Sequence, residues 1–78
     1  MKTERMLQET ELAALAKKFR EKAGKSKVEA ARELGVAPPT VFNAEEKPEM
    51  SLTKLRIRII ETYSPFKVTG PVFFLARK

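Results

Sequence analysis

The residues of this chain that could do chemistry are few in kind. No His, Cys, Trp or Asp occurs among its 78 residues, which removes the usual general base, the thiol nucleophile and the common metal ligands. The reactive groups that remain are Glu, Lys, hydroxyls and the single phenol of Tyr63, and no motif arranges them as a catalytic site. We therefore expect no enzyme, no metal and no cofactor, and the chemistry of the chain is expected to be that of binding.

Positive charge is the property that indicates a ligand. The chain has 16 Lys and Arg against 10 acidic residues, a net charge of +6, and this balance favours a polyanion as partner. Residues 17–32 carry seven basic residues against two acidic ones, residues 33–53 carry one against four, and residues 54–78 carry six against one. These blocks indicate a positive rim around a less positive centre, and the alternative is an ordinary solvated basic surface.

Length and composition are those of one small folded domain. A domain of 78 residues has a marginal core, so burial shared with a second copy is an attractive expectation. The hydrophobic share of 42% is ordinary for a folded protein. The absence of Cys and of a visible signal peptide favours the cytoplasm, and the apolar runs are too short to span a membrane.

Two helices are expected before residue 36. After a frayed start over residues 1–9, the first helix begins near Thr10, shows apolar residues at the spacing of one helix face, and ends at Gly24. The second begins at Ser26, because a glutamate three residues later completes the capping-box pattern. Gly35 ends it and supplies a left-handed turn.

A third helix is expected to begin at the prolines. Pro39 disfavours the helical conformation for Pro38, so we expect Pro38 as the cap and Pro39 as the first helical residue. The helix ends before Pro48, and Val41 and Ala44 face the core. Its outward face then carries Thr40, Phe42 and Asn43.

A fourth helix is expected from a Ser51 cap to about Tyr63. Residues 55–59 alternate apolar and basic side chains, which is also typical of a half-buried strand. Length and the cap favour the helix. In that case Ile57 and Ile60 fall outside the core face, where a partner would cover them.

The last segment, residues 65–78, is expected to be a β tail. It is rich in Phe and Val and is broken by Gly70 and Pro71, which favours a hairpin or one bent strand. A strand at the edge of a monomer would leave an apolar face and backbone groups in water, whereas the same segment of two copies can pair across a two-fold axis. Both an intrachain hairpin and an intersubunit pair stay open. The residues expected at a dimer interface are Ile57, Val68, Val72, Phe73, Phe74 and Leu75.

The order of these elements over residues 12–63 resembles the helix-turn-helix domain of the Cro and phage-repressor type, the XRE family. The most specific part is SKVEAARELGVAPPTVFNAE, residues 26–45, with Ser at the start of the second helix, a small Ala31, LGV in the turn, an aliphatic Val41 and Glu45. The resemblance implies a mainly α, lambda-repressor-like bundle of four helices with a C-terminal β-strand or hairpin used in dimerisation. It also implies a sequence-specific transcriptional regulator that binds double-stranded DNA as a homodimer on a near-palindromic operator.

The resemblance implies which residues contact the DNA. In the family the second helix crosses the backbone and the third enters the major groove. Asn43 is the best candidate for reading a base, because its amide can bind adenine with two hydrogen bonds; a solvated or capping role is the alternative. The family's base-facing positions fall on Pro38, Pro39, Thr40, Phe42 and Asn43. Phosphate contacts are expected from Lys17, Lys18, Lys27 and Arg32.

The expected reading helix departs from the family at several positions. Its prolines donate no hydrogen bond, Phe42 is apolar where a polar group is usual, and Glu46-Lys47-Pro48 replaces the family's Asn-Gly. The prolines and Phe42 can pack on thymine methyls, or specificity can come from DNA shape. Otherwise DNA binding is lost and Phe42 anchors a protein. This last reading leads to the alternative function, an antitoxin-like interaction module whose partner is a toxin or another protein.

Overall fold

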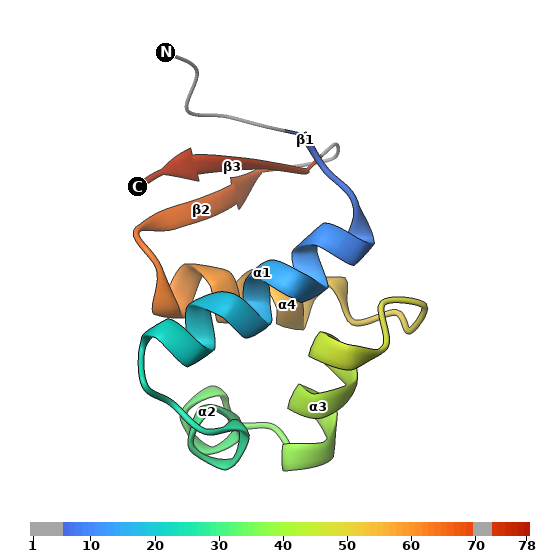
Figure 1. The fold of residues 1–78 in the computed structure, drawn as a ribbon, viewed down its shortest axis with the longest axis vertical. Coiled ribbons are helices and arrows are strands. Elements are labelled where there is room, and N and C mark those ends of the chain that lie inside the picture. The colour runs from blue at the N-terminus through green and yellow to red at the C-terminus, as the bar shows by residue number, and fades with distance from the viewer. Residues whose placement is uncertain (1–5, 70–72) are drawn as a thin grey trace.

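The helical elements form a bundle with a small sheet on one side, so the expectation of a mainly α fold with four helices is confirmed. The computed structural model describes residues 6–69 and 73–78, and at residues 6, 7, 9 and 73–75 it describes the backbone alone. In Figure 1, α1 and α4 cross the middle of the molecule, with the sheet on one side and with α2 and α3 on the other. The helices are α1 (Glu9–Lys22), α2 (Lys27–Leu34), α3 (Pro38–Glu46) and α4 (Thr53–Tyr63), and the strands are β1 (Met6–Leu7), β2 (Phe66–Thr69) and β3 (Phe73–Arg77).

Local signals explain where α1 and α2 begin and end. The capping box predicted for α2 is present, because Ser26 Oγ accepts from the Glu29 N–H at 3.0 Å and Glu29 Oε1 accepts from the Ser26 N–H at 2.8 Å. Gly35 ends α2 in the left-handed conformation, with φ of +73°. The start predicted for α1 lies two residues too far along the chain, because Gln8, not Thr10, is its cap residue. The frayed start predicted for residues 1–9 does not extend over residues 6–9, which belong to β1 and to the beginning of α1.

The starts of α3 and α4 each correct an expectation by one residue. Ala37 is the N-cap of α3 and Pro38 is its first helical residue. Neither proline removes a hydrogen bond there, because donors in the first turn have no partner within the helix, and the Ala37 carbonyl accepts from the Thr40 N–H at 2.9 Å. Helix α4 starts after Leu52 rather than after Ser51, and it is a helix, as favoured over the strand alternative.

The core is formed where α1 and α4 pack on each other and on their neighbours. Small residues on α2 and α3 let these helices approach closely, since Ala31 and Ala44 are buried. Ile60 is 0% exposed, so its expected place outside the core was wrong. Helix α4 contacts both α1 and β2, and its buried face is therefore wider than one stripe; Ile57 is half-buried.

The β tail is an intrachain hairpin that gains a third strand. The sheet order is β1-β3-β2 and both pairs are antiparallel. Val68 lies opposite Leu75, and Met6 lies opposite Phe74. Of the two alternatives, the structure has the hairpin within the chain, and β3 has a neighbour on each side. Among the expected interface residues, Val68 packs against the chain's own core, while Val72 and the side chains of residues 73–75 lie outside the described part.

The outer edge of β2 is closed by side chains from the end of α4. The Phe66 N–H donates to Ser64 Oγ at 3.2 Å, and the Val68 N–H donates to Glu61 Oε2 at 3.0 Å. A second strand would need these same donors to pair with β2. In the described ranges, 6–69 and 73–78, no helix has the length and apolar character needed to cross a membrane.

Candidate nucleic-acid interface

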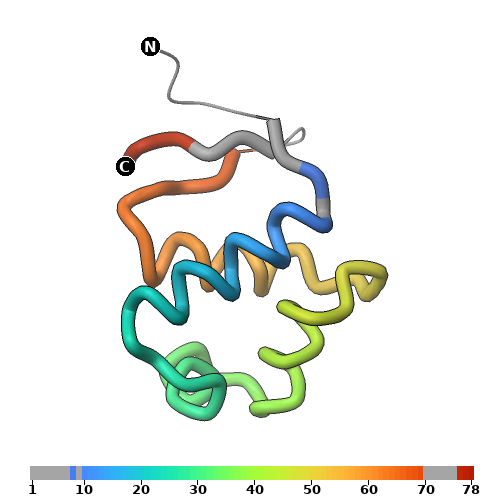
Figure 2. Tube along the Cα trace, in the orientation of Figure 1, coloured from blue at the N-terminus to red at the C-terminus, as the bar shows by residue number. Residues whose placement is uncertain are grey.

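Helices α2 and α3 are joined by a tight turn that fixes their relative position. The Val36 N–H donates to the Ala31 carbonyl at 3.0 Å, and Gly35 between them is left-handed. This hydrogen bond ties the residues after α2 to the last turn of the helix. Val36 is partly buried against the core. Figure 2 shows the sharp turn between α2 and α3 and the wider loop that leads from α3 to α4.

The outward face of α3 carries the residues expected to read bases. Val41 and Ala44 are 0% exposed, which directs the intervening positions of the helix outward. Phe42 is 45% exposed, a large value for an aromatic side chain. The structure places all of the expected base-contact residues at the surface of this one helix: Pro38, Pro39 and Phe42 are exposed, and Thr40 and Asn43 are half-buried.

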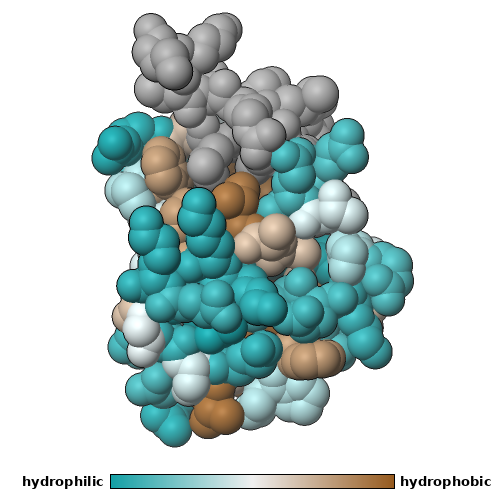
Figure 3. All heavy atoms as spheres, viewed as in Figure 1, coloured by the Kyte–Doolittle hydropathy of each residue, from teal (hydrophilic) through white to brown (hydrophobic). Residues whose placement is uncertain are grey.

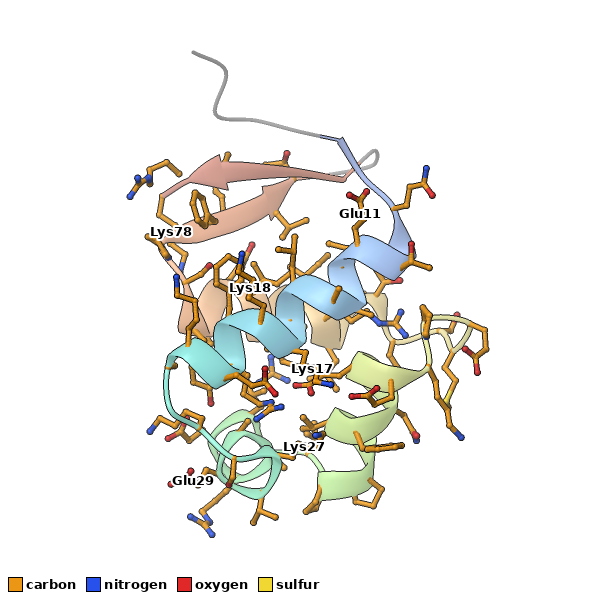
Figure 4. All side chains as sticks on the ribbon, viewed as in Figure 1. Glu11, Lys17, Lys18, Lys27, Glu29 and Lys78 are labelled. Atoms are coloured by element: carbon orange, nitrogen blue, oxygen red, sulfur yellow. The ribbon has the colours of Figure 1, made fainter. Side chains whose placement is uncertain are left out.

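Lys27 lies between α2 and α3. Its Nζ is 5.9 Å from the centre of the Phe42 ring and 3.9 Å from Glu45 Oε1, and Figure 4 shows it in the space between the two helices. Val28, beside it, is 52% exposed. In Figure 3 apolar surface appears among hydrophilic surface at the end of the molecule formed by α2 and α3. This end thus combines exposed apolar groups with a cation, a mixture suited to base methyls and phosphates.

The other expected phosphate ligands have different surroundings. Lys17 Nζ lies 3.0 Å from Glu46 Oε2, and the hydrogen bond to this carboxylate raises the pKa of Lys17. Figure 4 shows Lys17 on the α3 side of α1 and Lys18 on the sheet side, towards Lys78. Arg32 is exposed in the last turn of α2. Lys17 and Lys27 therefore border α3, and Lys18 does not.

A buried ion pair ties α3 to α1. Arg20 donates from Nε to Glu45 Oε2 at 2.6 Å and from Nη2 to Glu45 Oε1 at 3.0 Å, and its Nη1 donates to the Lys25 carbonyl at 2.6 Å. The two side chains are almost fully buried, and the hydrogen bond to Glu45 raises the pKa of Arg20. This bidentate geometry fixes the orientation of the Glu45 carboxylate relative to the Arg20 guanidinium as well as the distance between them. Glu45 was expected from the family pattern, but its partner was not.

Two arginines of α4 reach the backbone of the helix pair. Arg56, 1% exposed, donates to the carbonyls of Ala44 and Lys47, each at 2.8 Å. Arg58 donates from Nη2 to the Leu34 carbonyl at 2.8 Å, at the end of α2. The sequence showed these arginines only as the basic half of an alternating pattern.

An open pocket of about 600 Å³ adjoins the start of α3. It lies where the turn after α2, the first turn of α3 and the start of α4 meet, and it combines hydroxyls, two cations and an apolar floor. Hydroxyls and cations at a helix start suit an anion such as a phosphate. The sequence predicted a DNA contact for only one of its lining residues, Thr40. The lining residues are Val36, Thr40, Ser51, Leu52, Thr53, Lys54, Leu55 and Arg58.

Comparisons of the chain with protein-family models, with curated proteins and with solved structures found no match. The site therefore has to be interpreted from its own geometry. That geometry is a short helix with an exposed outward face, bordered by Lys27 on one side and by the cationic pocket with Lys54 and Arg58 on another.

Proposed function

We propose that this protein is a sequence-specific DNA-binding transcriptional regulator of the Cro and phage-repressor type, acting in the cytoplasm as a homodimer on a near-palindromic operator. The observation that carries the proposal is the outward face of α3. Phe42 is exposed there with Lys27 above its ring, while Glu45, buried one turn further along the helix, is locked to Arg20. A rigidly held helix with a protruding face is what groove reading requires.

The dimensions and chemistry of α3 fit the major groove. A helix with its side chains is about 10–12 Å across, and the major groove is about 12 Å wide, so α3, with nine residues, can enter it. Asn43 supplies an amide for an adenine edge, and the prolines and Phe42 supply apolar surface for thymine methyls. An operator rich in A·T pairs under α3 is therefore expected.

Cations on both sides of α3 are proposed to bind the backbone. Lys27 is 3.9 Å from Glu45 Oε1, beyond the length of a good hydrogen bond, so it is able to turn towards a phosphate. Lys54 and Arg58 in the pocket serve a second phosphate, together with the hydroxyl of Thr40. These contacts position the protein and carry no sequence information by themselves.

The homodimer is part of the same proposal. A two-fold axis would hold two copies of α3 about 34 Å apart, one turn of DNA, so that a near-palindrome is read twice. Two-fold pairing through the outer edge of β2 is disfavoured by Glu61 and Ser64, which already use the backbone donors of this strand. Ile57 is half-buried on α4 and remains a proposed contact, as does the sheet around residues 68–76.

Exposed apolar groups support one alternative function. Val28 and Met50 are 52% and 39% exposed, in addition to Phe42 at 45%, and exposed large apolar side chains are typical of protein contacts. In an antitoxin-like module Phe42 would anchor a toxin or another protein, and DNA binding would be secondary or absent.

Selection from random duplexes separates the two functions. The protein is mixed with a pool of random duplex DNA, and bound duplexes are recovered over several rounds in the presence of competitor DNA. A DNA-binding regulator enriches one near-palindromic sequence, whereas an interaction module that has lost DNA binding enriches none. Sedimentation of the protein with a duplex of one or two half-sites then gives the stoichiometry, and one chain on the complete operator would contradict the homodimer.

A further inference from the structure

Helix α3 lacks an ending of its own. Its last turn contains no basic residue, and no glycine follows it directly, since Lys47 is the C-cap residue with φ of −126° and ψ of 77°. The Lys47 N–H donates to the Asn43 carbonyl at 2.9 Å, which leaves the next carbonyls of the helix in need of donors. Helix α2, by contrast, ends at a left-handed glycine.

A donor for one of these carbonyls, that of Ala44, comes from α4, and the same side chain also binds the Lys47 carbonyl, which accepts from the Met50 N–H at 3.0 Å as well. Arg56 Nε donates to the Ala44 carbonyl and Arg56 Nη2 donates to the Lys47 carbonyl, each at 2.8 Å. The guanidinium is planar and permanently charged, so it holds two carbonyls in a fixed relative position. A cation at a helix C-terminus also interacts favourably with the helix dipole. Arg56 is thus a C-terminal cap that reaches α3 from a different helix.

We propose that Arg56 is a positioning residue for DNA recognition: it sets the end and direction of α3 and thereby the place of the Asn43 amide. This inference rests on the proposed function. Ala44, whose carbonyl Arg56 binds, directly follows Asn43 in the chain, and the last backbone bond of α3 ends on the Asn43 carbonyl itself. The Arg20–Glu45 pair holds the same turn through a side chain, whereas Arg56 holds its backbone.

The role of Arg56 is expected to affect specificity more than affinity. A bidentate contact to a base edge depends on the alignment of two hydrogen bonds, so a small tilt of α3 weakens it. Contacts from flexible lysines to phosphates tolerate the same tilt, because the side chain can follow. Loosening α3 therefore reduces binding to the operator while leaving binding to random duplex nearly unchanged.

The test compares Arg56→Lys with Ile59→Val, a core change on the same helix at a side chain that is 0% exposed. Lysine keeps the charge, but its single ammonium group cannot reproduce the two-donor fork. With both variants verified as folded, Arg56→Lys is expected to lower the ratio of operator to random-duplex affinity about tenfold, the size of one good base contact. Ile59→Val is expected to leave this ratio unchanged.

Amide hydrogen exchange tests the role of Arg56 in the free protein, without DNA. In free Arg56→Lys protein, the amides of Lys47 and Met50, which close the end of α3 and the following turn, are expected to exchange faster, while the amide of Val36 is unchanged. Unchanged exchange at Lys47, an unchanged specificity ratio, or an equal loss of that ratio in Ile59→Val would overturn the role of Arg56. Wild-type protein without preference for any duplex would refute the proposed function, whereas the exchange arm would still decide whether Arg56 holds α3.

Discussion

The two ends of the molecule are held together in different ways. At the α2–α3 end, arginines from α1 and α4 reach inward: Arg20 binds Glu45, and Arg56 and Arg58 bind backbone carbonyls. At the sheet end, the strands are joined by backbone pairing, and side chains of α4 reach outward to close the β2 edge, with Glu61 bound to the Val68 N–H.

The two ends therefore differ in what they leave exposed: the outward face of α3 is open to solvent, whereas the outer edge of β2 is covered by side chains of the same chain. Arg20 and Arg56 hold α3 from its inner side, and Phe42 on its outward side stays 45% exposed. The edge of β2 is, by contrast, satisfied within the chain before any partner arrives. We therefore propose the helix pair, and not the β2 edge, as the binding surface.

The largest expected effect comes from breaking the buried pair at the α2–α3 end. Glu45→Ala leaves the Arg20 guanidinium buried without its carboxylate, and is expected to lower the free energy of unfolding by about 3–5 kcal/mol. Urea denaturation measures this loss. Lys17→Ala removes the more exposed Lys17–Glu46 pair and is expected to lower the free energy of unfolding far less, because solvent screens an exposed ion pair. Equal losses of unfolding free energy in the two variants would contradict the view that the buried Arg20–Glu45 pair holds α3 in place.

The next effect concerns the open face of α3. Asn43→Ala is expected to weaken binding to the selected operator by about 1–3 kcal/mol and to relax the preference at one base pair. Competition titrations with operator variants measure both. The same loss on random duplex would show that Asn43 contacts only the backbone.

Opening the closed edge is expected to have a smaller effect. Glu61→Ala removes the acceptor of the Val68 N–H, at a cost of about 1 kcal/mol, and leaves a free donor on the edge of β2. Self-association in sedimentation experiments is expected to increase. Glu61→Gln keeps an acceptor oxygen and serves as the control. An unchanged association state in the alanine variant would show that Glu61 does not guard this edge.

Acidification is expected to have the smallest effect per residue. The pKa of Glu29 is lowered by the Ser26 backbone N–H, and the pKa of Glu33 is lowered by its hydrogen bond with Lys25. A carboxylate whose folded pKa is depressed stabilises the fold above its unfolded pKa, about 4.3, and this contribution is lost as the pH falls through the folded pKa. The melting temperature is therefore expected to fall below about pH 5, and less so in Glu29→Gln. A melting temperature that rises on acidification would contradict these directions.

Local signals predicted the α2–α3 end well. The Ser26 cap and the Gly35 turn are decided by residues within a few positions of one another, and the inward places of Val41 and Ala44 follow from helical spacing. The predicted start of α3 was one residue too late, because either proline can occupy the first turn without loss of a hydrogen bond.

Contacts between distant segments were not predictable from patterns. Glu45 lies 25 residues from its partner Arg20, and Ala44 lies 12 residues from its partner Arg56. Nothing in the sequence around either arginine specifies these partners. Strand β1 has two residues, too few for a pattern, and it forms because β3 provides an edge. Ile60 is buried since α4 is covered by α1 and by β2, an arrangement that the alternating sequence around it does not reveal.

If the α2–α3 end is a DNA-binding surface, as proposed, duplex binding depends strongly on salt. Affinity for the selected operator is measured between about 50 and 200 mM salt for the wild type and for Lys27→Ala. Log affinity is expected to fall linearly with log salt concentration, and the slope is expected to be reduced by about one in the variant on operator and random duplex alike. An affinity that does not change with salt, or no duplex binding at all, would contradict the proposed DNA-binding surface.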